Sequence, residues 1–346
     1  MADISTHTPV PEKAPAAGRK PHPVVSLLGM SCGLGVILVL LLMVFIMPSL
    51  KSGPHDLRVG MVGAPAAVAE FEQTLTAAAP EAYEPQRFES EEGLRAAILD
   101  PDIVGGFVLD GSDFCALVAS AGSATISGAL TNTAHVIGQV TGTNVSVEDV
   151  VPLPKADPTG IGIGGLAFPL VFGGIVPVVA FRKVFPRSNT WYLAGLVGFA
   201  ALGGIVVAAV LTFSFGSIEA AFWPVAASMA MGIAALALPL AGLQNVFGAK
   251  GFTIGAMAMM FLGNPLAGIS TTSAWLPSGL GTFGQILPPG AAGALVRSAA
   301  YFHGAGGLTA ALTLAAWIVV GLVLFAIGTR RAPVVASTAP APSPAG

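Results

Sequence analysis

Residues 24–47, VVSLLGMSCGLGVILVLLLMVFIM, contain no Asp, Glu, Lys or Arg. An apolar run of this length can cross a hydrocarbon core about 30 Å thick as a helix. A secretory signal is the alternative, but its apolar core spans only about 7–15 residues and ends at a small-residue cleavage site. This run is longer and ends in Met47-Pro48-Ser49-Leu50-Lys51. We therefore expect an uncleaved anchor that forms the first membrane span.

The composition of the 346-residue chain is that of an integral membrane protein. Hydrophobic residues make up 54% of it and charged residues 10%, whereas a soluble domain usually has about 25% charged residues. No run of Lys or Arg predicts a nucleic-acid partner. The two cysteines, Cys32 and Cys115, lie in different segments, so an internal disulfide is not expected. We expect a multi-pass protein of the cell membrane, in contact with the lipid bilayer.

Five more apolar segments follow, at residues 161–181, 191–213, 224–247, 252–269 and 308–327. Together with residues 24–47 they predict an α-helical membrane protein with six transmembrane helices. Six crossings would place most basic residues of the connections on one side, as the positive-inside bias requires, with Arg297 on the other. Both termini are then cytoplasmic. The basic residues on the cytoplasmic side are Arg182, Lys183, Arg187, Lys250, Arg330 and Arg331.

The insert between the first two spans, residues 48–160, holds almost all of the 18 acidic residues. Its pattern predicts a small α/β domain around a mixed sheet, placed outside the cytoplasm by the six crossings. The remaining spans form a five-helix transmembrane domain, residues 161–329. The tails at residues 1–23 and 330–346 are expected to be disordered and cytosolic. Predicted strands are 57–63, 82–88, 103–109, 114–119 and 145–153, and predicted helices are 65–79, 91–99 and 123–141.

Gly263-Asn264-Pro265 interrupts the predicted fifth span after about a dozen residues, or roughly 18 Å of helix. The chain then stays apolar but contains several Gly and Pro. Irregular backbone at membrane depth is tolerated where protein buries it or where it lines a cavity. One interpretation is a helical hairpin at about residues 265–307 that dips in from the outer face; the other is a long external loop.

Asn264, Pro265 and Arg297 are the candidates for a substrate pathway or gate in this region. Each also has a purely structural interpretation, because Asn264 can cap a helix end and Arg297 can reach lipid head groups. No Walker lysine motif or Gly-x-Ser-x-Gly elbow occurs, and the five histidines have no partner at metal-ligand spacing. No enzyme site, metal or cofactor is therefore expected. The spans also lack the ionisable residues that proton- or sodium-driven carriers generally use.

Three short motifs and the order of segments carry a family resemblance. The motifs are Asp157-Pro158-Thr159-Gly160, Gly263-Asn264-Pro265 and Leu287-Pro288-Pro289-Gly290-Ala291-Ala292-Gly293. One span, an α/β external domain and five spans with a broken fifth together resemble the ABC-2 type permease family, in particular single-chain permeases related to the phage infection protein group. The resemblance covers about residues 24–329, and the layout carries more of it than any single motif.

The resemblance implies a permease subunit of an exporter, because such permeases form a homodimer and use a separate ATP-binding subunit. The substrate would be amphiphilic or hydrophobic and would move outward. The connection at residues 182–190 would dock the ATPase, so the docking candidates are Arg182, Lys183 and Arg187. The alternative is a non-transporting membrane scaffold or receptor whose external domain binds a partner, which fits the short connection and the acidic domain equally well.

Overall fold

The computed structural model describes residues 23–331 except residues 112 and 278. The described residues are mostly helical and include a five-stranded sheet. The chain divides into two compact units, Met1–Met43 and Val44–Gly346. The predicted disordered tails lie outside the described residues, apart from residue 23 and residues 330–331, which belong to helices.

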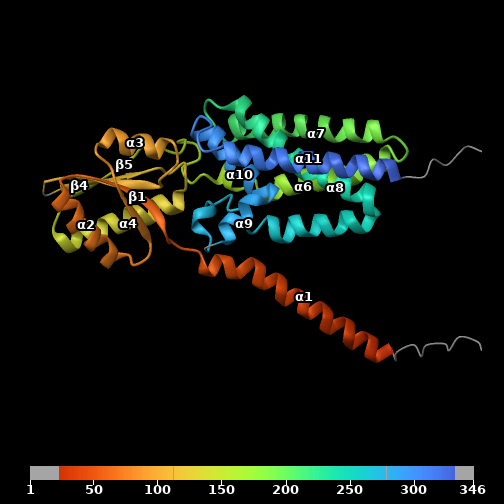
Figure 1. The fold of residues 1–346 in the computed structure, drawn as a ribbon, viewed down its shortest axis with the longest axis horizontal. Coiled ribbons are helices and arrows are strands. Elements are labelled where there is room, and N and C mark those ends of the chain that lie inside the picture. Colours follow the sequence, from red (N-terminus) through yellow and green to blue (C-terminus); the bar gives the residue numbers. More distant parts are fainter. Residues whose placement is uncertain (1–22, 112, 278, 332–346) are drawn as a thin grey trace, which may run out of the picture. The chain divides into compact units, whose positions relative to one another are not determined.

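Helix α1 (Pro23–Lys51) contains the predicted first span (Figure 1). Its 29 residues exceed the roughly 20 that a membrane-crossing helix needs. Proline is well tolerated at the first position of a helix, because its missing N–H would have no intrahelical acceptor there. The helix therefore begins one residue before the predicted span and runs past Met47 to Lys51.

The α/β domain predicted for the insert is present (Figure 1). Its strands are β1 (Leu57–Val62), β2 (Tyr83–Arg87), β3 (Gly105–Asp110), β4 (Asp113–Val118) and β5 (Val145–Asp149). Its helices are α2 (Pro65–Ala78), α3 (Glu91–Leu99) and α4 (Ala124–Thr141). The strand order is β2-β1-β3-β4-β5, with β3 and β4 antiparallel and the other neighbours parallel, so the sheet is mixed as predicted. Strand β5 ends before the predicted residue 153, because the chain bends at residues 150–151.

Helices cover both faces of this sheet, α2 and α4 on one and α3 on the other (Figure 1). On the first face the Phe71 ring centroid lies 4.9 Å from those of Phe107 and Phe114. Near the second face Arg95 of α3 donates to both carboxylate oxygens of Glu148 on β5, at 2.7 and 2.5 Å. These hydrogen bonds favour the charged carboxylate and lower the pKa of Glu148.

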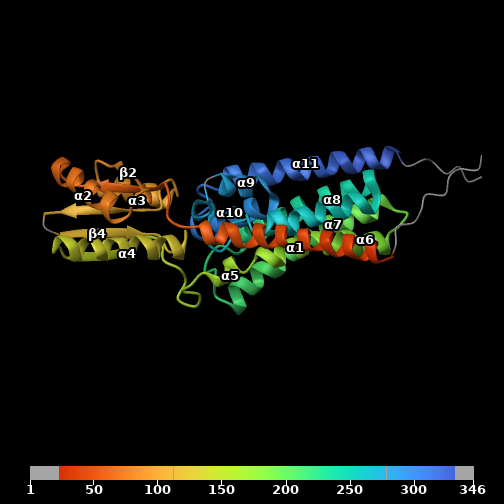
Figure 2. The ribbon, with the colours of Figure 1, turned by 90° about the horizontal axis from the view of Figure 1, so that it is seen from below.

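The rest of the chain forms a helical bundle in which α8 lies beside α7 and α11 (Figures 1 and 2). Two of its helices end in a π-helical turn, η1 and η2. The elements are α5 (Ile161–Gly164), α6 (Ala167–Val184), α7 (Asn189–Ala209), η1 (Val210–Ser214), α8 (Phe222–Ala258), η2 (Met259–Gly263), η3 (Ser273–Trp275), α9 (Leu280–Ile286), α10 (Pro288–Tyr301) and α11 (Leu308–Arg331).

Five described helices are long and apolar enough to cross a membrane, which supports an integral membrane protein. They are Pro23–Pro48, Ile161–Val184, Asn189–Ser214, Phe222–Gly263 and Leu308–Arg330. The sequence predicted six spans, and the difference lies in one place. The predicted spans 224–247 and 252–269 fall largely within the single helical stretch Phe222–Gly263, which is interrupted at Gly248.

The interruption at Gly248 reverses the chain. Its φ of 66° and ψ of −153° lie outside helical geometry, in a region that glycine enters most easily. A Cβ added to Gly255 would lie 2.7 Å from Leu243 Cδ1 and 2.9 Å from Leu240 Cδ2. In a straight helix residues 243 and 255 would be about 18 Å apart along the axis. The arms before and after Gly248 therefore pack against each other.

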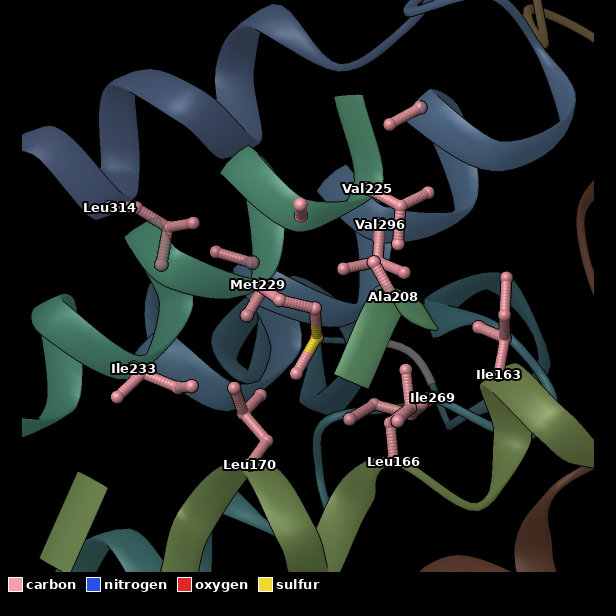
Figure 3. Close-up of a cluster of buried hydrophobic side chains, with 14 of the residues drawn as sticks. Ile163, Leu166, Leu170, Ala208, Val225, Met229, Ile233, Ile269, Val296 and Leu314 are labelled. Carbon is pink, nitrogen blue, oxygen red and sulfur yellow. The ribbon is translucent and has the colours of Figure 1, made fainter. Parts of the chain in front are cut away.

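The core of the bundle gathers side chains from α6, α8, α10 and α11. Figure 3 shows Leu170, Met229, Ile233, Val296 and Leu314 in this cluster, all almost fully buried. Helix α10 is thus a core element, although it belongs to the segment that the sequence left open between a hairpin and an external loop. The packing shows that this segment is folded against the bundle.

Close contact between α8 and α10 generates a stability prediction. A Cβ added to Gly232 of α8 would lie 2.7 Å from Ala292 Cβ of α10 and 3.1 Å from Leu170 Cδ1. We expect Gly232→Leu to lower the free energy of unfolding by about 1–3 kcal/mol, because it overpacks this interface. The measurement is the thermal unfolding of the detergent-solubilised protein.

The matched control is Gly198→Leu on α7, where an added Cβ meets nothing within 4 Å. This variant should unfold close to the wild-type temperature. Equal unfolding temperatures for the two variants would contradict the packing of α10 against α8.

Candidate functional site

The candidate site begins where the arm after Gly248 ends, at Gly263, as the sequence predicted. The Asn264 N–H donates to Met259 O at 3.1 Å, which closes the π-helical turn η2. Pro265 follows and has no N–H with which to continue the helix. Asn264 is buried, and its Oδ1 has no hydrogen-bond partner within the part of the chain that the structure describes. The side chain therefore does not use this oxygen to cap the helix.

The segment after Pro265 folds back tightly through glycines. We use the name hairpin for residues 265–307, which include η3, α9 and α10. A Cβ added to Gly284 would lie 1.8 Å from Leu266 O, so only glycine permits this approach. Gln285 Nε2 donates to Ala267 O at 3.1 Å. This side-chain amide thereby provides a hydrogen bond to a backbone carbonyl that lies outside regular helix.

The α/β domain contacts the hairpin within the unit Val44–Gly346. Ser123, the N-cap residue of α4, donates from Oγ to Thr271 O at 2.6 Å. Phe302, just beyond α10, is buried in the same cluster as Leu94 and Ile98 of α3. A hydrogen bond and an apolar contact thus join the two parts.

A cavity of about 280 Å³ lies at this contact, and we call it the junction cavity. The α/β domain supplies much of its apolar wall, including Ile98, Ile103 and Ile126. The hairpin supplies polar groups, including Thr272, Ser273, Gln285, Arg297 and Ser298. The volume is near the lower end of the range for small-molecule sites, about 300–1,000 Å³. An apolar wall facing a few polar groups is the usual composition of such a site.

Arg297 is the charged residue among those that line the junction cavity. Its Nη2 donates to Ile269 O. None of the three ion pairs between described residues involves Arg297, and no carboxylate of that part of the chain lies within 4.0 Å of its guanidinium. A partly buried charge without a counter-ion is costly, because the protein does not replace all of the lost hydration. The cavity is therefore suited to an anion.

Thr272 is held in a strained conformation at the cavity wall. Its φ of 90° and ψ of 159° lie in a region that is occupied almost entirely by glycine, at a cost of about 1–3 kcal/mol for other residues. Its Oγ1 is buried and has no hydrogen-bond partner among the described residues. Such outliers cluster at binding and catalytic sites.

The structure separates the predicted pathway residues. Arg297 lines the junction cavity, whereas Asn264 and Pro265 do not. Sequence reasoning missed Thr272 and Gln285. A usable signal was present, since residues 270–273, Ser-Thr-Thr-Ser, form a run of hydroxyl side chains within an otherwise apolar segment.

Arg182, one of the predicted docking residues, lies in a polar network where α6, α7 and α8 meet. Its guanidinium donates to Asn189 Oδ1 at 3.1 Å, to Gln244 Oε1 at 3.5 Å and to Asn245 Oδ1. Its Cζ lies 3.8 Å from the centroid of the Tyr192 ring. Arg182 therefore has a structural role, while Lys183 and Arg187 are exposed.

Two motifs of the family resemblance have local structural functions. Asp157 is buried and accepts hydrogen bonds from the N–H groups of Ile161 (2.9 Å) and Gly162 (2.8 Å), which places it at the start of α5. In the proline motif, Pro288 begins α10, and a Cβ on Gly293 would lie 2.6 Å from Ile269 Cγ1. The small residues of that motif let α10 enter the core.

The Arg182 network predicts unequal effects of two neighbouring substitutions. We expect Arg182→Ala to lower the free energy of unfolding by about 2 kcal/mol, since hydrogen bonds to a charged group contribute about 1.5–3 kcal/mol. Lys183→Ala should change it by less than about 0.5 kcal/mol, because Lys183 is exposed. Thermal unfolding in detergent measures both. Similar losses for the two variants would show that the network does not stabilise the bundle.

Comparison with protein-family models, with curated proteins and with solved structures gave no match to this chain. Its function must therefore be inferred from its own residues and geometry.

Proposed function

We propose that this chain is the membrane-spanning permease subunit of an ABC-type exporter. It moves an amphiphilic or hydrophobic substrate outward, and a separate subunit hydrolyses ATP. The observation that carries the proposal is the distribution of charge: residues 191–213 and 308–327 contain no Asp, Glu, Lys or Arg. The same holds for residues 161–181 and 224–247. Ion-driven carriers generally place such groups within the membrane, so an external energy source fits this chain better.

We infer six crossings of the cell membrane, with both termini in the cytoplasm. The reversal at Gly248 supports this number, since it divides Phe222–Gly263 into two arms. Lys250 follows the reversal, and Arg182 and Lys183 end α6. Placing these basic residues inside satisfies the positive-inside bias and puts the α/β domain outside.

The proposed mechanism is a rigid-body rearrangement between two copies of the chain. The broken arm at Gly263 and the hairpin behind it provide non-helical backbone that lines or gates the outer exit. Arg297 contributes through the junction cavity. Asn264 contributes through its buried Oδ1, which has no hydrogen-bond partner among the described residues, and Pro265 through the helix break.

Lys183 and Arg187 are the proposed contacts for the ATP-binding subunit, because both are exposed, Lys183 in the last turn of α6 and Arg187 in the connection to α7. Arg182 supports that connection from within, through its hydrogen bond to Asn189.

The second candidate is a non-transporting scaffold or receptor whose α/β domain binds a partner. The observation in its favour is that the Arg182 guanidinium forms hydrogen bonds within the bundle. Only a small basic surface is therefore left for docking in this connection. A scaffold would be purified without a nucleotide-binding subunit.

The six-crossing arrangement predicts opposite accessibility for two connections. In a protein with Cys32→Ala and Cys115→Ala, Glu219→Cys should react with an impermeant thiol reagent in intact cells. Lys250→Cys should react only after permeabilisation. Both native side chains are exposed, so burial does not account for a difference. Labelling of both positions in intact cells would contradict the arrangement.

The docking surface predicts a charge-dependent partner. Purification from the native host in mild detergent, followed by mass spectrometry, should recover an ABC-type ATP-binding subunit. The double variant Lys183→Glu/Arg187→Glu should lower that recovery by about tenfold or more, because like charges placed at an interface cost several kcal/mol.

The matched control is Arg58→Glu/Lys155→Glu, which reverses two exposed cations outside this connection, Arg58 on β1 and Lys155 between β5 and α5. Its recovery should equal that of the wild type. Absence of any ATP-binding subunit from the wild-type sample would favour the scaffold.

A further inference from the structure

We propose that the junction cavity binds the anionic head of an amphiphile, a carboxylate or phosphate group carried on an apolar chain. This is an assignment of a binding site. It stands whether or not the chain exports a substrate, so binding can be tested without transport.

The charge of the site comes from Arg297. A guanidinium presents several N–H donors in a planar fork. Only Nη2 has a protein acceptor, Ile269 O, among the described residues. The other N–H groups of the guanidinium have no acceptor in the described part of the chain, and Arg297 lines the cavity, so these groups are the proposed ligand contacts. Carboxylates and phosphates match this fork, because they accept two parallel hydrogen bonds.

A second unpartnered group lines the same cavity. Thr272 Oγ1 is buried and has no hydrogen-bond partner in the described part of the chain. Two neighbouring polar side chains are already engaged: Gln285 donates to Ala267 O at 3.1 Å, and Ser298 donates to Ala305 O at 2.7 Å. Arg297 and Thr272 still offer donors that have no acceptor within the described residues, and the proposed anion would accept from these groups.

The apolar wall selects the rest of the ligand. Ile98, Ile103 and Ile126 from the α/β domain and Phe302 from the hairpin line the cavity. An inorganic anion would leave these side chains uncovered, whereas an alkyl chain next to the head group would cover them. The volume of about 280 Å³ limits the enclosed part to the head and the beginning of the chain.

The test measures binding to the full-length protein in nanodiscs of neutral phosphatidylcholine. The probes are decanoate, decyl phosphate and decanol, which have the same alkyl length but differ in head-group charge. We expect wild-type protein to bind the two anions at least about tenfold more tightly than decanol, since the neutral hydroxyl of decanol cannot accept the stronger, charge-assisted hydrogen bonds of the guanidinium. Equal affinity for decanol and decanoate would overturn the proposal.

Variants locate the binding. Arg297→Gln removes the charge and should weaken decanoate binding at least about tenfold, while Arg297→Lys, which keeps the charge but lacks the planar fork, should restore only part of it. Arg58→Gln, on the exposed face of β1, is the matched control and should bind as the wild type does. Ala274→Trp tests the cavity independently, because Ala274 is an exposed lining residue and a bulky side chain there should obstruct entry.

Thermal unfolding identifies any variant that fails to fold. If Arg297→Gln unfolds, Ala274→Trp decides the result. Wild-type affinity in every folded variant would overturn the proposal.

One further arm distinguishes the sources of the ligand. Nanodiscs that contain phosphatidylglycerol supply an anionic head from the bilayer. A fall in decanoate affinity in these nanodiscs would support a site filled by a membrane lipid. Unchanged affinity, with tenfold discrimination against decanol retained, would support a site for a free amphiphile.

Discussion

The structure depends on pairing the backbone where regular helix stops within the packed bundle. Buried N–H and C=O groups need hydrogen-bond partners, so such a segment must be paired within the protein. After the break at Gly263, side chains take three of its carbonyls: Gln285 binds Ala267 O, Arg297 binds Ile269 O, and Ser123 binds Thr271 O. The three donors come from α9, α10 and α4. One requirement, hydrogen-bond partners for the backbone after the helix break, therefore accounts for the buried hairpin and for its contact with the α/β domain.

The junction cavity follows from the same requirement. Here side chains from separate elements form hydrogen bonds to backbone carbonyls. These hydrogen bonds do not fill the space between the elements, whereas two directly packed helices would fill it. The cavity opens at this point, between the apolar wall of the α/β domain and the polar groups of the hairpin. Because Arg297 binds a neutral carbonyl, its positive charge persists at the cavity. Local backbone pairing thus determines the electrostatic character of the site.

The sequence predicted the elements of the α/β domain well, because strands and helices there alternate with clear periods and turns. It also predicted the break at Gly263, since Pro265 cannot continue a helix. The junction cavity could not be predicted from the sequence, because Ile98 and Arg297 are distant in the chain and line the same cavity only after folding. The strain at Thr272 depends on a backbone conformation that no local pattern specifies. For Arg182 the polar partners Gln244 and Asn245 were visible in the sequence, but their proximity was not.

Arg182 and Arg297 show why an unpaired arginine at the cavity is informative. Both lie in parts of the bundle where they have no carboxylate partner within 4.0 Å among the described residues. Around Arg182 the chain supplies side-chain oxygens of three amides and an aromatic ring. Among the described residues, Arg297 has one carbonyl acceptor. The fold is thus able to give an arginine several neutral acceptors, and the smaller number of acceptors at Arg297 distinguishes the junction cavity.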